Sequence, residues 1–167
     1  NNQVTFLLQV LFLEKKIESL HITRSMQDRA QQLSEEIDAV NERLELIAKT
    51  SNLSLQLYSW YIQHGHARNE EDRKTLDALM QDPILERVQS VKGFYERLYR
   101  YQCHCWYGFI TQDFLMHYRY AQKWVDLFEK EEGMKQIESA QYIKGLHNLI
   151  SAHFDLKNRD KFKEWFD

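Results

Sequence analysis

Residues 25–48, SMQDRAQQLSEEIDAVNERLELIA, decide the fold class of this chain. Their apolar residues recur in alternating steps of four and three: Met26, Ala30, Leu33, Ile37, Val40, Leu44 and Ile47. This spacing lines one side of an α-helix with about 3.6 residues per turn, whereas a strand alternates every second residue. The stretch therefore predicts an amphipathic helix, with Ser25 as its N-cap and Asp28 in its acidic first turn.

The same rhythm continues on both sides of this stretch. A helix is expected before it, over about residues 3–21, and Thr50, Ser51 and Asn52 offer the cap of the next one, which ends near Gly65. Asn69, Asp82, Asp113, Ser139 and Asn158 begin further helices, and Gly133 ends the one that Asp113 begins. A single long helix can cover residues 83–110, with Gly93 as the point where it bends or splits.

Composition supports the same fold class. The chain has 167 residues, of which 43% are apolar, with only five Gly and one Pro. A β-sandwich or a glycine-loop nucleotide-binding fold needs more turn residues than these. We expect an all-α protein of about seven to eight helices, in which short loops make neighbouring helices antiparallel.

Charge and apolar runs exclude several classes of partner. The net charge is −3 and no part of the chain is strongly basic, so we expect no nucleic-acid and no membrane partner. The apolar run of residues 4–13 is half the length of a spanning helix and lacks the basic start of a signal peptide. Cys103 and Cys105, two apart on a helix, point in different directions and are expected to be unpaired thiols. The chain is therefore predicted to be cytoplasmic.

The two ends suggest a segment of a longer protein. The chain opens at Asn1 without Met and stops at Asp167 within an amphipathic pattern. We therefore expect residues 1–167 to form a single helical-repeat segment. Trp165 and Phe166 would then lack a covering neighbour, which predicts a weak homodimer through them.

Two stretches carry the pattern of a known repeat. Residues 146–162, LHNLISAHFDLKNRDKF, combine an Asn-Leu with small and aromatic residues, a polar turn and a charged helix start; residues 106–128 look like a second copy. The pattern resembles tetratricopeptide-repeat proteins, in a lengthened form. Asp113 and Asn158 are 45 residues apart, against about 34 in the standard repeat. The turn glycine is replaced by Gln112 and Lys157, and the small residue that follows by His117 and Phe162.

The resemblance implies an architecture and a binding surface. Residues 69–167 would form tetratricopeptide-like antiparallel helix pairs stacked as an α-solenoid, while residues 1–68 share only the helical character. Its concave groove would bind a protein or peptide partner without a cofactor. The candidate groove residues are Asn148, Lys144, His147, Ser151, Tyr99, Gln102 and Trp106.

Two other classes of function stay open from the sequence. One is a self-associating structural or regulatory helical module, driven by the aromatic residues of 94–128 or by the ends. The other is a metal-binding or Cys/His-dependent helical-bundle enzyme built on Cys103, His104 and Cys105. A zinc site usually needs a second ligand pair, and no His-Glu-x-x-His stretch is present. We therefore favour a non-catalytic interaction scaffold without metal or cofactor.

The register of the last repeat predicts that Leu149 is packed in the core. Replacing it, as Leu149→Ala, should lower the free energy of unfolding by about 2–5 kcal/mol, because burial is lost and a cavity is left. Chemical denaturation measures this change. A loss below about 0.5 kcal/mol, the size expected at a surface position, would show that the register is wrong.

Overall fold

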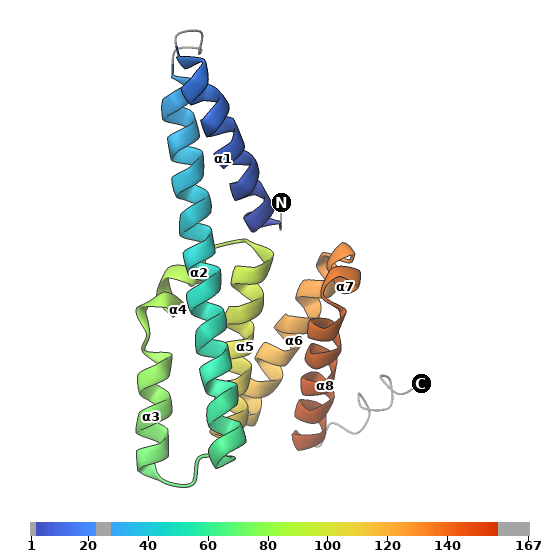
Figure 1. Cartoon of the computed structure of the whole chain (residues 1–167). Coiled ribbons are helices and arrows are strands. Elements are labelled where there is room, and N and C mark those ends of the chain that lie inside the picture. Colours follow the sequence, from blue (N-terminus) through green and yellow to red (C-terminus); the bar gives the residue numbers. More distant parts are fainter. Residues whose placement is uncertain (1–2, 23–27, 157–167) are drawn as a thin grey trace. The chain divides into compact units, whose positions relative to one another are not determined.

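A computed structural model describes residues 3–22 and 28–156 of the chain, and this part is helical without strands. The elements are α1 (Val4–Leu20), α2 (Arg29–His64), α3 (Glu70–Met80), α4 (Pro83–Arg87), the 3-10 helix η2 (Val88–Ser90), α5 (Phe94–Ile110), α6 (Phe114–Lys130), α7 (Gly133–Ile137) and α8 (Ser139–Asp155) (Figure 1). They form two compact units, residues 1–49 and 50–167. Within the described ranges, none of the helices has the length and apolar character needed to cross a membrane.

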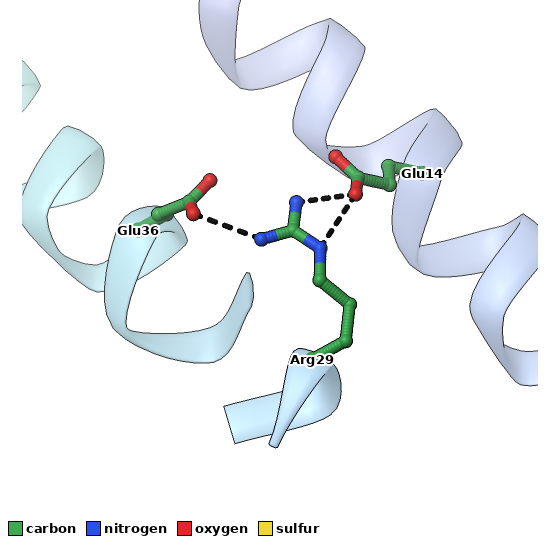
Figure 2. Close-up of polar contacts among 3 residues, drawn as sticks. All are labelled: Glu14, Arg29 and Glu36. Atoms are coloured by element: carbon green, nitrogen blue, oxygen red, sulfur yellow. Dashed lines mark hydrogen bonds and ion pairs between the residues drawn. The ribbon is translucent and has the colours of Figure 1, made fainter. Parts of the chain in front are cut away.

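The first unit is a hairpin of α1 and the beginning of α2. Its core consists of buried side chains from both helices: Val4, Leu11, Leu33, Ile37 and Val40. Arg29 adds a polar link, because its guanidinium binds Glu14 of α1 through two nitrogens and Glu36 of α2 at 3.0 Å (Figure 2). The hairpin is therefore held by apolar packing on one side of each helix and by one bridging cation.

The structure corrects the expected break between residues 48 and 50. Helix α2 runs without interruption for 36 residues, so Thr50, Ser51 and Asn52 lie inside it and cap nothing. Neither Gly nor Pro occurs between Arg29 and His64, and the apolar side continues through Leu53 and Leu57, which are both buried. Burial of these residues outweighs the weak cap preference of the polar triplet. The predicted cap Ser25 lies outside the described residues.

Three other predicted caps are confirmed. The side chain of Asn69 accepts a hydrogen bond from the backbone N–H of Asp72 at 2.8 Å, at the start of α3. Asp82 accepts from Ile84 N at 2.9 Å before α4, whose first residue is Pro83. At the start of α6, the carboxylate of Asp113 accepts a hydrogen bond from the backbone N–H of Met116 at 2.9 Å. These caps satisfy N–H groups that the helices leave unpaired.

The expected long helix over residues 83–110 is divided into shorter helices. The last of them begins after Gly93, the residue at which a bend or split was expected. Helix α5 begins after Gly93, over which the carboxylate of buried Glu96 lies. A Cβ at Gly93 would come within 2.0 Å of Glu96 Oε2, so a side chain at this position would require the Glu96 carboxylate to move. Gly133 differs from its prediction: α6 ends at Lys130, and Gly133 begins the short helix α7.

The core of the second unit lies between α5, α6 and α8, which pack antiparallel, with α6 in contact with both others (Figure 1). Large buried side chains fill it: Phe94, Leu98, Trp124, Phe128 and Leu149. Leu149 is fully buried, as the register of the last repeat predicts. The expected helix from Asn158, with Trp165 and Phe166, lies outside the described residues.

Two glycines allow α6 to come close to its neighbours. A Cβ at Gly108 of α5 would lie 2.7 Å from the backbone nitrogen of His117 on α6. A Cβ at Gly145 of α8 would lie 3.0 Å from Cδ1 of Trp124, also on α6. Both helices therefore approach α6 at points where a side chain is missing.

Gly108→Ala should lower the free energy of unfolding by about 1–3 kcal/mol, because the methyl group meets backbone that cannot rotate away. The gain in helix propensity, about 1 kcal/mol, opposes this loss without cancelling it. Thermal or urea unfolding measures the change.

The matched control is Gly133→Ala. No heavy atom lies within 4 Å of a Cβ placed at Gly133, so this variant should keep or slightly raise stability. Equal stability changes in the two variants would contradict the close approach of α5 and α6.

Candidate functional site

A cleft of about 150 Å³ lies in the second unit, between the Thr50–His64 part of α2, α5 and α8. Trp124 of α6 also lines it. Two serines, two glutamines, four aromatic residues, one leucine and one lysine form its wall: Ser51, Ser54, Leu55, Tyr58, Tyr99, Gln102, Trp106, Trp124, Gln141 and Lys144. The cleft thus combines aromatic surface with neutral polar groups.

A relay of hydrogen bonds connects the three helices across the cleft. Ser54 Oγ of α2 donates to Gln102 Oε1 of α5 at 3.2 Å, and Gln102 Nε2 donates to Gln141 Oε1 of α8 at 2.8 Å. Gln102 is only 5% exposed, so both ends of its amide are fixed by partners within the protein. The relay ends at the amide nitrogen of Gln141, which can donate two hydrogen bonds.

Aromatic rings form the other part of the wall. The rings of Tyr58 and Trp106 lie 4.8 Å apart between centroids, and Lys144 Nζ lies 5.3 Å from the centre of the Tyr58 ring. Trp124 is 1% exposed, and its indole nitrogen has no hydrogen-bond partner among residues 3–22 and 28–156. A buried indole N–H without an acceptor is costly, so packing against the neighbouring helices, and not a hydrogen bond, holds this ring.

The cleft is rich in donors and carries a positive charge. Of the described residues that line it, none is Asp or Glu, and Lys144 is the cation. Burial, together with the negative charge of Glu138, raises the pKa of Tyr99, which therefore keeps its phenolic proton. The groups that can face a ligand are thus Lys144, the Gln141 amide and tyrosine hydroxyls. Such a set suits carbonyl or carboxylate oxygens.

The structure brings four of the seven predicted groove residues together. Tyr99, Gln102, Trp106 and Lys144 all line the cleft. Three others lie on α8 but do not line it: His147 is exposed, Ser151 is half-buried, and Asn148 is buried and donates to the carbonyl oxygen of Lys144 at 2.8 Å.

The orientation of α8 explains this division. Gly145 faces Trp124, and Asn148, three residues further on, shares the side of α8 that faces the core. Asn148 therefore holds its own helix rather than a groove surface.

The residues of α2 and of the start of α8 that line the cleft were not predicted from the sequence. Ser51, Ser54 and Tyr58 lie three and four residues apart on one side of α2, a signal that the expected break at Thr50 concealed. Gln141 lies three residues before Lys144 and therefore on the same side of α8, so stepping back one turn would have found it.

The side chains of Cys103, His104 and Cys105 lie within the packed part of the second unit. Both sulfurs are fully buried, and burial raises the pKa of each thiol, so both stay protonated at neutral pH. Cys103 Sγ donates to the carbonyl oxygen of Thr50 at 3.5 Å, and His104 stacks on Tyr120 with 4.3 Å between ring centres. In the described part of the chain, no three His, Cys, Asp or Glu side chains converge to hold a metal.

His117 is a buried histidine on α6. Its ring is fully buried beside Phe109, and neither ring nitrogen makes a hydrogen bond within the described residues. The Asn148 side chain and Asp155, whose Oδ2 lies 4.0 Å from Nδ1, both favour the charged ring, but burial outweighs them and lowers the pKa of His117. The folded protein therefore holds a neutral imidazole at this position.

Comparison with known proteins gives no relative for this arrangement: no family model, no curated protein and no solved structure matches the chain.

The lowered pKa of His117 predicts a loss of stability in mild acid. An unfolded histidine titrates near pH 6.5, so below that pH the unfolded chain binds a proton that the folded chain resists. Stability should thus be full above about pH 6.5 and fall as the pH drops toward the folded pKa. Burial lowers the pKa of His104 as well. His117→Gln should therefore reduce, without abolishing, the slope of unfolding free energy against pH between about 5 and 7.

The control is His147→Gln, the same change on the exposed side of α8. Urea unfolding at several pH values measures both variants. An unchanged slope in His117→Gln would mean that this ring is protonated with equal ease in the folded and unfolded chains.

Proposed function

We propose that this chain is a non-catalytic interaction module that binds a peptide segment of a partner protein in the cleft of residues 50–167. The observation that carries the proposal is the Ser54–Gln102–Gln141 relay, which leaves amide donors beside Lys144 and next to the aromatic wall. Peptide backbone offers carbonyl acceptors, and its side chains offer apolar or aromatic groups for Tyr58 and Trp106. A peptide therefore fits both halves of the wall.

The size of the cleft favours a peptide over a whole cofactor. Sites that enclose a drug-sized ligand usually have volumes of about 300–1,000 Å³. The cleft, at about 150 Å³, is smaller and suits one side chain with its adjoining backbone. Contacts of this kind give specificity to a segment that continues along the surface.

The fold that we propose for this module is a tetratricopeptide-like superhelix with long repeats. In it, α5 and α6 would form one repeat and α8 would begin the next. Antiparallel packing of α5, α6 and α8 supports it, as does the cap by Asp113 at the turn between α5 and α6. The φ of Gln112 is +59°, the left-handed conformation that favours the glycine of the repeat turn. The unpaired buried thiols Cys103 and Cys105 are consistent with a cytoplasmic location.

A peptide-display selection against the 167-residue chain tests the proposal. Selected peptides should bind the wild-type chain and quench or shift the fluorescence of Trp106 and Trp124. The double variant Gln141→Ala with Lys144→Ala should bind them about tenfold more weakly, because one hydrogen bond to an amide and one to a cation are lost. Fluorescence titration measures both affinities.

The matched control is Lys123→Ala. Lys123 Nζ lies 4.7 Å from the centre of the Tyr120 ring on α6, an arrangement like that of Lys144 over Tyr58 but outside the cleft. Its loss should leave peptide affinity unchanged. Selected peptides that bind all three proteins equally would show that the cleft is not the binding site.

A further inference from the structure

Helix α1 has apolar residues on two sides, of which α2 covers one. Val4 and Leu11 are buried against α2, and Leu7 and Leu8 pack beside them. The other side carries five large apolar side chains that are 42% to 78% exposed: Phe6, Val10, Leu13, Ile17 and Leu20, which we call the α1 stripe. At about 100° per residue, the centre of the stripe lies about 150° around the helix from the buried side.

The exposed side of α2 differs from that of α1 in the kind of residue that it carries. On its side away from α1 it exposes acidic residues, Glu35, Asp38, Glu42 and Glu45, at helical spacing. A helix that is apolar on opposite sides is normally covered on both. The contrast between α1 and α2 therefore points to an additional partner for α1.

The spacing of the α1 stripe identifies the kind of partner. Its members follow each other in steps of four, three, four and three, which is the heptad repeat of a two-helix seam. In heptad letters, Val10 and Ile17 occupy a, whereas Phe6, Leu13 and Leu20 occupy d. In parallel coiled coils, β-branched residues at a with leucine at d favour two strands over three or four.

We propose that the α1 stripe is a homodimer interface, in which α1 of one chain pairs in parallel and in register with α1 of a second copy. A symmetric pair brings the a and d residues of one copy against the same residues of the other. This inference rests on residues 3–49 alone and is independent of peptide binding in the cleft.

The charges around the stripe fit a second copy. The stripe itself contains no charged residue, so pairing with itself brings no like charges together. Gln9 and Lys16 lie at g positions on one flank, and Glu14 lies at an e position on the other. A parallel pair sets each g flank against the other copy's e flank, so Gln9 faces the second copy's Glu14.

The area of the α1 stripe, and the ion pairs that hold α1 on α2, also suit a dimer. Five side chains of this size and exposure offer roughly 500 Å², near the top of the range for exposed apolar patches on monomers. Two copies would then bury about 1,000 Å², the lower limit of a specific interface. Arg29, bound to both Glu14 and Glu36, fixes α1 on α2 and so presents the stripe on a braced hairpin (Figure 2).

Sedimentation equilibrium of the full 167-residue chain over a hundredfold range of concentration tests the proposal. The wild-type chain should sediment with twice the mass of one chain at the upper concentrations. Ile17→Lys should raise the dimer dissociation constant by about a hundredfold or more, because the symmetric dimer loses the buried side chain twice. Its helical content by circular dichroism should stay that of the wild type, because Ile17 is 59% exposed within the chain.

Ile143→Lys is the matched control, since Ile143 on α8 is 65% exposed and lies outside the stripe. It should dimerise as the wild type does. The orientation is tested by Leu20→Cys, which should cross-link to itself on mild oxidation in a parallel pair; the native cysteines are buried and do not compete.

A wild-type chain that stays monomeric at every concentration would overturn the proposal. So would a dimer that Ile17→Lys leaves intact, or one that Ile143→Lys weakens as much as Ile17→Lys does. A dimer that Ile17→Lys dissociates, but in which Leu20→Cys fails to cross-link, would overturn the parallel arrangement.

Discussion

The second unit depends on how closely α6 approaches α5 and α8, and two glycines set that distance. Gly108 leaves room for the backbone at His117, and Gly145 leaves room for the ring of Trp124. Helix positions without a Cβ let neighbouring backbones approach to within van der Waals contact. As a result Trp124 is buried against Gly145, and the wall around it closes into a cleft whose polar groups are fixed by partners on three helices.

Local features of the fold could be predicted from the sequence. The caps of Asn69, Asp82 and Asp113 depend on residues three positions away or fewer, and the apolar rhythm depends on neighbours one turn apart. The prediction of a helix break at Thr50 was wrong because continuous burial of Leu53 and Leu57 stabilises the helix more than a cap would. That competition depends on contacts with distant parts of the chain, of which the hydrogen bond from Cys103 is one.

The candidate site was predictable only in part for the same reason. Register along one helix places Tyr99, Gln102 and Trp106 together, and all three line the cleft. Ser54 and Tyr58 come from a helix more than 40 residues earlier, and no local pattern brings them opposite Gln102. Asn148 was misplaced because the rotation of α8 is set by the contact of Gly145 with Trp124, which periodicity alone does not reveal.

We propose that a partner peptide binds in the Gln102–Gln141 cleft. Nuclear magnetic resonance of the ¹⁵N-labelled chain, titrated with a display-selected peptide, tests it most directly. Binding in the cleft should shift the side-chain amide signals of Gln102 and Gln141 together with the indole signals of Trp106 and Trp124. The indole signal of Trp60, which does not line the cleft, should stay in place. Shifts that leave these four signals unchanged and fall elsewhere on the chain would contradict it.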